Sequence, residues 1–356
     1  MIKTGSSYYI TTPFVSPASG LTCTSYTISV FIWDGLKASI PGTANYTITK
    51  KNPTGSIGSD EIDIAKEIAD FIDFTARQNA GTGKFNADNN VWFHSYNTYI
   101  TTLAADATTQ QNHLTQLASL GYSYGNEGEN ITAITNNILL SGIEFKVDRA
   151  GFFSLPVLGD ESSPMAVTVI SYPDNEINYS ASIVASTTSS VLVQNIWVDL
   201  SETTTDTYVE IGFNGITTTL LIQDELKYTP LDILFQNKEG GQQFLTFFKE
   251  RTDELTVTDN SYESFRGQPS LGNHQFIRFN VQGEESFKVN SGWVDEVMNE
   301  TFIQLLLSER IWSYDGVTFT PLDIKSKQLT LKTQQKERLI NYEIQFKPSY
   351  NKINNV

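Results

Sequence analysis

Apolar and polar residues alternate with a period of two along much of the chain, which is the pattern of half-buried β-strands. Residues 26–33 (Tyr-Thr-Ile-Ser-Val-Phe-Ile-Trp) are rich in β-branched and aromatic side chains and run into the turn pair Asp34-Gly35. Residues 46–50 and 91–100 repeat the pattern. We therefore expect the first 105 residues to form a β-sandwich.

Helical periodicity is restricted to a few segments. The clearest is an amphipathic helix expected at about residues 60–76, capped by Ser59 or Asp60. A polar stretch near 108–120 also reads as a helix, and a short helix is expected around 294–307. The apolar stripe of the first helix consists of Ile64, Ala65, Ile68, Phe71 and Ile72, and that of the last consists of Val297, Phe302, Ile303 and Leu306.

Turn pairs divide the rest of the chain into hairpins. Asn214-Gly215 lies between two alternating runs and is the strongest short-range hairpin signal in the sequence. Further hairpins are expected around 236–241 and around Asp315-Gly316, and the polar residues 347–356 are expected to be a loose tail. Other strands are expected at 143–147, 166–171, 190–200, 207–213, 231–235, 243–248, 311–314, 317–319, 329–331 and 339–346.

These elements predict a mainly β fold of two or three β-sandwich-like domains, with one conspicuous amphipathic helix and a few short helices. Strands and helices do not alternate regularly, which disfavours a doubly wound α/β fold. The expected domains are a β-sandwich with an inserted helix at 1–105, a helical or loop connection at 106–130, a β-sandwich at 131–228, and a β-rich domain with a short helix and hairpins at 229–356.

Charge is sparse and unevenly distributed. The 356 residues include 24 basic and 40 acidic side chains, for a net charge of −16, and 40 threonines. The net charge is −4 over residues 1–150, −14 over 151–299 and +2 over 300–356. A protein that binds nucleic acid through phosphate contacts needs a basic face, so we expect no nucleic-acid partner.

The residue types that hold cofactors are scarce. Cys23 is the only cysteine, and the three histidines, His94, His113 and His274, are far apart in the sequence, so no transition-metal or iron–sulfur site is expected. Residues 199–206 are rich in Asp but lack the spacing of a calcium loop, and no phosphate-binding loop motif occurs. We expect no cofactor.

No segment has the features of a membrane span or an export signal. Apolar runs are far shorter than the roughly 20 residues that cross a bilayer, and the first 17 residues contain no apolar core of a secretion signal. We therefore expect synthesis and folding in a cytoplasm.

One motif matches a catalytic pattern. Gly121-Tyr-Ser-Tyr-Gly125 fits the G-x-S-x-G nucleophile elbow, in which Ser123 would follow a strand and precede a helix. Here the preceding segment reads as a helix and the following residues as a turn, so a glycine-flanked loop is the better interpretation. No feature of the sequence identifies two carboxylates as the acid–base pair of a glycosidase either. We expect a protein without catalytic activity.

Aromatic side chains leave a second, non-enzymatic function open. They make up 12% of the chain, and rings of this kind can stack on sugars. A receptor- or carbohydrate-binding β-module is therefore the alternative function, with a glycan as its partner. The candidate rings are Tyr8, Tyr9, Trp92, Tyr96 and Tyr99.

Several segments resemble structural proteins of tailed bacteriophages that infect Bacteroidetes, crAss-like phages among them. Segment 231–249, Leu-Asp-Ile-Leu-Phe-Gln-Asn-Lys-Glu-Gly-Gly-Gln-Gln-Phe-Leu-Thr-Phe-Phe-Lys, resembles their strand–Asn-x-x-Gly–strand unit. The ending is similar to their closing meander, and the opening to their first strands; these stretches are 305–312, 321–324 and 342–346, and 8–17 and 28–35.

The resemblance implies a structural virion protein of the tail hub, baseplate or neck. Its partners would be copies of itself in a symmetric homo-oligomer and other tail proteins, and it would be assembled in the host cytoplasm. The composition agrees, because threonine- and asparagine-rich surfaces with few charges suit broad, wet protein–protein contacts. Under the alternative function, the receptor- or carbohydrate-binding β-module would belong to a phage tail or a cell surface and bind a host glycan.

A basic stretch near the C-terminus is the candidate interaction site. We expect it to dock on an acidic face of a neighbouring subunit, mainly steering assembly while apolar loops supply most of the affinity. Its residues are Lys325, Lys327, Lys332, Lys336 and Arg338.

Charge reversal tests this site. Changing Lys325, Lys327, Lys332 and Lys336 together to Glu should slow assembly, most visibly at low salt, where screening is weakest. A single change should do little, because an exposed ion pair contributes only about 0–1 kcal/mol. Light scattering during assembly measures the effect, and a wild-type rate and extent in low salt would show that the stretch does not dock.

Overall fold

The computed structural model confirms a mainly β fold. Its α-helices within the described residues are α1 (Ala65–Ala69) and α2 (Asn299–Leu307). These residues also include the 3-10 helices η2 (Leu200–Glu202) and η3 (Glu296–Met298). None of these helices is long and apolar enough to cross a membrane. The structure describes residues 1–15, 20, 22–34, 36–52, 58–72, 76, 85–87, 90–100, 110–112, 115–125, 138–140, 142, 144–159, 165–183, 193–264, 272, 274–326, 328–330, 339–350 and 352–353.

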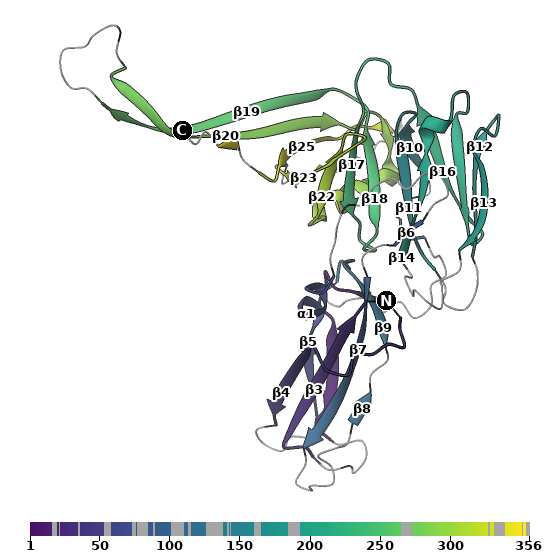
Figure 1. Ribbon diagram of the computed structural model, residues 1–356, viewed down its shortest axis with the longest axis vertical. Coiled ribbons are helices and arrows are strands. Elements are labelled where there is room, and N and C mark those ends of the chain that lie inside the picture. Colours follow the sequence, from purple (N-terminus) through teal and green to yellow (C-terminus); the bar gives the residue numbers. More distant parts are fainter. Residues whose placement is uncertain are drawn as a thin grey trace.

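The N-terminal part is one sheet with the strand order β1-β9-β7-β3-β4, in which β8 also pairs with β7 (Figure 1). A separate ribbon of β2 and β5 packs beside it, and both contribute to one apolar cluster that includes Tyr26, Ile62 and Phe93. The strands predicted at 26–33, 46–50 and 91–100 are confirmed. The bounds are β1 (Ile2–Lys3), β2 (Tyr9–Pro13), β3 (Ser25–Trp33), β4 (Tyr46–Lys51), β5 (Ser59–Asp63), β7 (Asn90–Ile100), β8 (Gln110–Asn112) and β9 (Gln116–Ser119).

The helix predicted at 60–76 is wrong in its first part. Residues 59–63 form β5, because antiparallel pairing with β2 satisfies their backbone and turns Ile62 into the core. The short α1 follows, and the carboxylate of Asp63, instead of Ser59 or Asp60, accepts a hydrogen bond from the amide of Ala65 at 3.0 Å. The predicted stripe of Ile64, Ile68 and Ile72 is buried, whereas Phe71 is exposed. Residues 73–75 lie outside the described part.

The helix predicted at 108–120 is also wrong. This segment contains β8 and β9, and β9 lies between β1 and β7 in the sheet. Hydrogen bonding to strands on both sides outweighs a local helical preference. The predicted connection at 106–130 therefore contributes a central strand, and the domain boundaries drawn there stay predictions.

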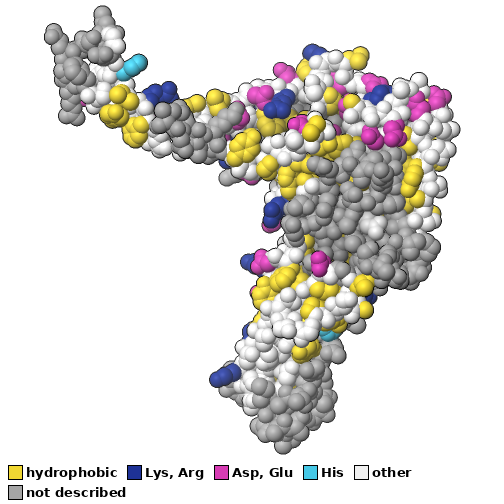
Figure 2. Space-filling model, in the orientation of Figure 1, with side chains coloured by type: hydrophobic (Ala, Val, Ile, Leu, Met, Phe, Trp, Pro, Cys, Tyr) yellow, Lys and Arg dark blue, Asp and Glu magenta, His cyan; other side chains and the backbone are white. Residues whose placement is uncertain are grey.

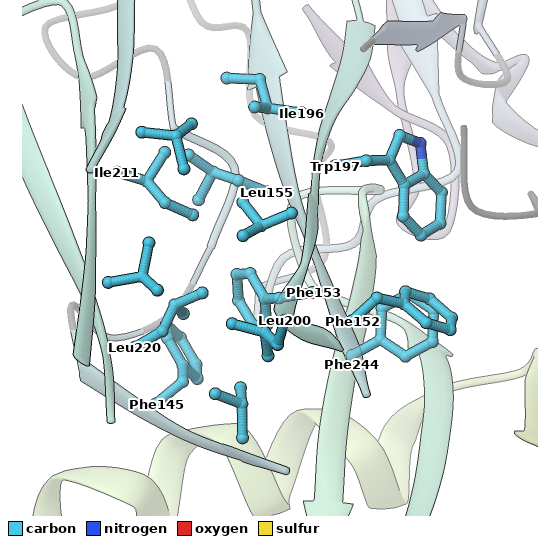
Figure 3. Packing of buried hydrophobic residues seen from close by; sticks show 14 of the residues in the cluster. Phe145, Phe152, Phe153, Leu155, Ile196, Trp197, Leu200, Ile211, Leu220 and Phe244 are labelled. Atoms are coloured by element: carbon cyan, nitrogen blue, oxygen red, sulfur yellow. The ribbon is translucent and has the colours of Figure 1, made fainter. Parts of the chain in front are cut away.

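The middle part contains a five-stranded sheet, β10-β16-β15-β12-β13, and a three-stranded sheet, β11-β14-β6. Side chains from both sheets meet in one apolar cluster (Figure 3), in which Leu155 and Ile196 come from one sheet and Ile211 and Leu220 from the other. The Asn214-Gly215 hairpin is confirmed, with φ of 48° and 81° at its two turn residues. The bounds are β6 (Phe85–Ala87), β10 (Glu144–Asp148), β11 (Phe152–Leu158), β12 (Met165–Tyr172), β13 (Asn178–Ile183), β14 (Val193–Asp199), β15 (Tyr208–Phe213) and β16 (Ile216–Gln223).

The C-terminal part is an eight-stranded sheet with the order β18-β17-β22-β23-β25-β20-β19, in which β26 also pairs with β20. The two predicted hairpins, β17–β18 and β22–β23, are confirmed, and the helix predicted at 294–307 is confirmed in its second half as α2. The predicted loose tail is wrong where β25 and β26 occupy it. The bounds are β17 (Leu231–Gln236), β18 (Gln242–Phe247), β19 (Arg251–Glu263), β20 (Phe276–Asn290), β21 (Val294–Asp295), β22 (Ile311–Tyr314), β23 (Phe319–Ile324), β24 (Leu339–Ile340), β25 (Glu343–Pro348) and β26 (Lys352–Ile353).

The middle and C-terminal parts share apolar packing across their boundary. Phe244 of β18 lies against Phe152, with ring centroids 4.9 Å apart, and against Trp197 at 5.9 Å (Figure 3). Tyr314 of β22 contacts Phe152 from the other sheet at 4.6 Å. These large rings hold the two parts together as one continuous body.

Asp232 lies at this boundary in an unfavourable position for a charge. Its carboxylate accepts a hydrogen bond from the Thr246 hydroxyl at 2.6 Å and faces Gly151 in the β10–β11 turn. Burial, reinforced by the nearby carboxylate of Asp148, raises the pKa of Asp232 to about 6.

Replacing this carboxylate should stabilise the protein at neutral pH. A pKa above the unfolded value of about 3.9 means that the folded state binds the proton more tightly. Ionisation of Asp232 therefore lowers the free energy of unfolding. The loss is complete above about pH 6, partial between about pH 4 and 6, and absent below about pH 4. Asp232→Asn, which keeps the acceptor for Thr246, should raise the free energy of unfolding by about 1–3 kcal/mol at pH 7.5 and leave it unchanged near pH 4.

Urea denaturation at the two pH values measures this effect. Asp315→Asn is the control with the opposite sign, because hydrogen bonds from Thr318 and Val317 lower the pKa of Asp315. That variant should lose stability at pH 7.5. Equal stability of Asp232→Asn and the wild type at pH 7.5 would show that the pKa of Asp232 is not raised in the folded protein.

Candidate interaction surfaces

An arm formed by β19 and β20 projects from the C-terminal sheet (Figures 1 and 2). The two strands pair from Arg251 opposite Val289 to Glu263 opposite Phe276, with one register shift. Every residue of β19 is exposed, and thirteen residues at about 3.3 Å each extend about 40 Å. No part of the sequence analysis predicted this arm, which is the most exposed element among the described strands.

The root of the arm is fixed to the body by charged and aromatic contacts. Glu284 of β20 forms ion pairs with Lys325 at 3.2 Å and with Lys347 at 3.3 Å, and these two ammonium groups lower its pKa. The guanidinium of Arg251 lies 4.3 Å from the ring centroid of Phe287. These contacts give the arm a defined direction where it leaves the sheet.

The outer part of the arm has two unlike faces. The pairing register shifts between Thr258 and Asn260, where β20 has an extra residue and Asn280 has a φ of 51°. Beyond this bulge Tyr262 pairs with Ile277 and contacts the ring of Phe279 at 5.7 Å. Since neighbouring side chains point to opposite faces of a strand, these three residues share one face.

The opposite face of the outer arm is charged. Arg278 and Asp259 form an ion pair there at 2.7 Å, next to Phe276, which pairs with Glu263. The exposed fractions of the four apolar tip residues are 50% for Tyr262, 61% for Phe276, 39% for Ile277 and 48% for Phe279. The three-residue set of Tyr262, Ile277 and Phe279 is called the tip face below.

Of the five basic residues predicted to form a docking site, the structure describes only one. Lys325 bonds within its own chain, to Glu284 and to the hydroxyl of Ser286 at 3.3 Å. It therefore anchors the arm root, and the docking role of the stretch stays a prediction. Lys327, Lys332, Lys336 and Arg338 lie outside the described residues.

An apolar cavity of about 270 Å³ opens between β10, β18 and the segment from β21 to α2. Its wall includes four phenylalanines, and Val297 and Met298 of η3 lie at its end. The four are Phe145, Phe244, Phe248 and Phe302. Val297 is 74% exposed, so apolar surface continues from the cavity to the outside. Charged side chains contribute at the edge, namely Glu144, Lys146 and Asp295.

The turn between β17 and β18 joins the N-terminal sheet to the rest of the body, and this region is called the junction below. The side chain of Asn237, which is fully buried, accepts hydrogen bonds from the amides of Glu239 and Gly241, both at 3.0 Å. Its amide group donates to the carbonyl of Leu139 at 2.6 Å. Asn237 thus fixes the shape of the turn and ties it to a segment 98 residues away.

The N-terminal sheet meets this turn at very close range. A Cβ atom on Gly240, whose φ is +86°, would lie 2.7 Å from the amide nitrogen of Gly121. The amide of Tyr122 donates to the carbonyl of Lys238 at 2.8 Å, and the side chain of Gln236 donates to the carbonyl of Leu120.

An ion pair that involves a buried lysine, together with a helix, completes the junction. Lys3, which is 1% exposed, lies 2.8 Å from Glu239. The side-chain oxygen of Gln304, from α2, accepts a hydrogen bond from the amide of Lys238 at 3.1 Å. The Asn-x-x-Gly unit that carries the resemblance therefore holds three parts of the chain together.

The G-x-S-x-G motif forms the other half of this junction. The segment before it is the strand β9, so the helix predicted there is wrong. The backbone amide of Ser123 donates a hydrogen bond to the Ser6 hydroxyl at 2.8 Å, and that hydroxyl donates to the Ser123 carbonyl. The hydroxyl of Tyr124 donates to Glu300 of α2 at 2.6 Å. These bonds tie the motif to the N-terminus and to α2.

The other candidate residues are not gathered into one site. His94 lies in the N-terminal sheet and His274 on the arm, while His113 lies outside the described residues. Within the described residues no three His, Cys, Asp or Glu side chains are placed to hold a metal ion. Tyr99 is buried and Tyr8 is packed on Phe93, so these aromatics form no exposed platform with Tyr9 and Tyr96; the side chain of Trp92 is outside the described part.

The close contact at Gly240 predicts that one added methyl group there strongly destabilises the protein. Gly240→Ala adds a Cβ that would clash with Gly121 and Ser119 at a backbone conformation that L-residues avoid. It should lower the free energy of unfolding by about 2–4 kcal/mol. Gly316→Ala is the matched control, because Gly316 has a φ of +92° but no atom within 4 Å of the added Cβ; it should cost about 1 kcal/mol. Denaturant unfolding measures both variants. Equal losses of unfolding free energy in the two would show that the close crossing at Gly240 does not contribute to stability.

Comparison of the chain with models of protein families, with curated proteins and with solved structures gave no match.

Proposed function

We propose that the chain is a structural protein of a bacteriophage tail, in the hub, baseplate or neck, which acts as a repeated assembly subunit without catalysis. The observation that supports this proposal is the exposed arm of β19 and β20. The subunit would assemble with copies of itself and with other tail proteins in the host cytoplasm.

The arm has the physical properties of a segment that is completed by a partner. A two-stranded ribbon has no core of its own and is only marginally stable in water. The tip face exposes two rings, Tyr262 and Phe279, which are about half exposed, together with Ile277. A fully buried ring covers about 150–250 Å², so these three side chains offer a contiguous apolar patch of the order of the few hundred Å² that often mark an interaction site. A single folded chain therefore exposes a surface that suits a neighbour.

The body of the protein suits the role of a rigid subunit. The five- and three-stranded sheets around one core are the arrangement expected for a β-sandwich domain, and the N-terminal sheet with its packed ribbon fits a second one. The junction around Asn237 and the shared rings at Phe152 link these parts firmly. A rigid body can place an arm and its docking surface at fixed positions in a ring.

A second function, recognition of a host receptor or carbohydrate, has one observation in its favour. The exposed aromatic side chains of the arm belong to the outermost pairs of β19 and β20, where a receptor binder would present them. Against it, the tip face combines Ile277 and Phe279 with a single hydroxyl, that of Tyr262. Sugar sites need several polar groups beside a ring. Assembly is therefore the better proposal.

Shortening the arm tests the proposal. Residues 258–282 are replaced by an Asn-Gly turn, which keeps the pairs Leu255–Glu285 and Val257–Gly283 and closes them with a favoured hairpin turn. The variant should unfold at the wild-type temperature but sediment as a monomer under conditions in which the wild type forms oligomers. Analytical ultracentrifugation measures the difference.

Three outcomes separate the functions. A shortened chain that forms wild-type oligomers contradicts an assembly role for the arm. Glycan-array binding by the isolated wild-type chain that is lost on shortening favours the receptor function instead. Absence of the protein from purified virions of the phage that encodes it, measured by mass spectrometry, would overturn the tail assignment.

A further inference from the structure

We propose that the tip face of the arm docks in the apolar cavity between β10, β18 and η3 of a second copy of this chain, with Phe279 as the anchoring side chain. This inference rests on the proposed function and names the contact through which subunits would join. Both surfaces lie within the described residues. The tip face is exposed in a single chain, whereas the phenylalanines that line the cavity are 0–3% exposed and the cavity is open to the outside at Val297.

The cavity has the size and chemistry to receive one aromatic ring. Its volume of about 270 Å³ equals about nine water molecules at 30 Å³ each, and a phenylalanine side chain has seven heavy atoms. Four phenylalanines line the cavity, and ring–ring contacts add to the burial of apolar area. The charged groups lie at the edge, where they can stay in water while a ring enters.

The tip face is shaped to present such a ring. Tyr262 supports Phe279 from the neighbouring strand through an edge contact, so the ring of Phe279 is held in position before binding. Ile277 extends the apolar surface beside it, and the ion pair of Arg278 with Asp259 lies on the opposite face. Entry of the tip face would therefore bury no unpaired charge.

The occupant must come from another molecule. The arm points away from the body to which it belongs (Figure 1), so the tip cannot reach its own cavity. Its length of about 40 Å exceeds the width of a domain of about 100 residues, whose radius of gyration is about 13 Å. A neighbour is therefore within reach.

The contact joins two different patches, and this decides the kind of assembly. A patch that binds a different patch on the next copy produces a closed ring or an open filament rather than a simple dimer. Stable interfaces bury about 800 Å² on each partner, of which the tip face supplies a few hundred. Leu255 and Val257, exposed along the stem of the same arm, offer further apolar surface to the neighbour.

Cross-linking between two tagged versions of the full chain tests the contact directly. One version carries Phe279→Cys and the other Val297→Cys, at the exposed edge of the cavity, and a short bis-maleimide joins cysteines that come close. The native Cys23 is 1% exposed and stays unreactive. The mixed pair should give a cross-linked heterodimer on a denaturing gel, at least tenfold more than the control pair of Phe276→Cys and Val317→Cys.

Substitutions test the energetic role of each surface. Phe279→Glu and Val297→Glu should each raise the concentration needed for assembly at least tenfold. The matched controls, Phe276→Glu on the opposite face of the arm and Val317→Glu, equally exposed at 74% on a distant turn, should change it less than twofold. All four positions are substantially exposed, and circular dichroism verifies that each variant folds.

The outcomes distinguish this inference from the proposed function. If shortening the arm or Phe279→Glu prevents assembly while Val297→Glu and the cross-link do not differ from their controls, the arm docks elsewhere and only the cavity assignment fails. If the shortened chain assembles normally, the proposed function and this inference fail together. A small apolar molecule retained in the cavity, detected by native mass spectrometry, would also overturn the docking model.

Discussion

The close crossing of two backbone segments at Gly121 and Gly240 is the constraint on which the arrangement of the chain depends. No side chain fits between them, because a Cβ on either residue would lie within 2.8 Å of the other segment. Asn237 holds the turn in the required shape with hydrogen bonds from two of its amides. Because the N-terminal sheet, the β17–β18 hairpin and α2 all bond at this point, the orientation of one determines that of the others.

The direction of the arm is fixed relative to the body by contacts at its root. The ion pairs of Glu284 and the stacking of Arg251 on Phe287 set the direction of the arm at its root. The arm and the cavity lie on the same side of the crossing at Gly121 and Gly240, so the distance between them depends on the packing of Phe244 and Tyr314 against Phe152. If this packing were loose, the proposed docking on a neighbour would cost additional ordering entropy.

Local signals in the sequence predicted the strands and hairpins well, and distant contacts account for the errors. Asn214-Gly215 demands a specific turn whatever surrounds it, so its hairpin was confirmed. Residues 59–63 and 116–119 became strands because partners far away in the sequence satisfy their backbones. The bond from Asn237 to Leu139 spans 98 residues, and no pattern around Asn237 identifies that partner. The arm escaped prediction because both of its faces carry polar residues and its strands bury no regular apolar side.

The charges on the arm limit the ways in which it can bind. β19 has no neighbour on its outer edge among the described strands, and such an edge invites pairing with other strands. Asp253, Glu254, Asp259 and Glu263 lie along it, so two β19 edges placed side by side would bring like charges together. Pairing between arms is therefore disfavoured, whereas the uncharged tip face meets no such repulsion. In the proposed assembly, the acidic edge would therefore leave the apolar tip face as the surface that contacts a neighbour, and it would favour the body of that neighbour over its arm.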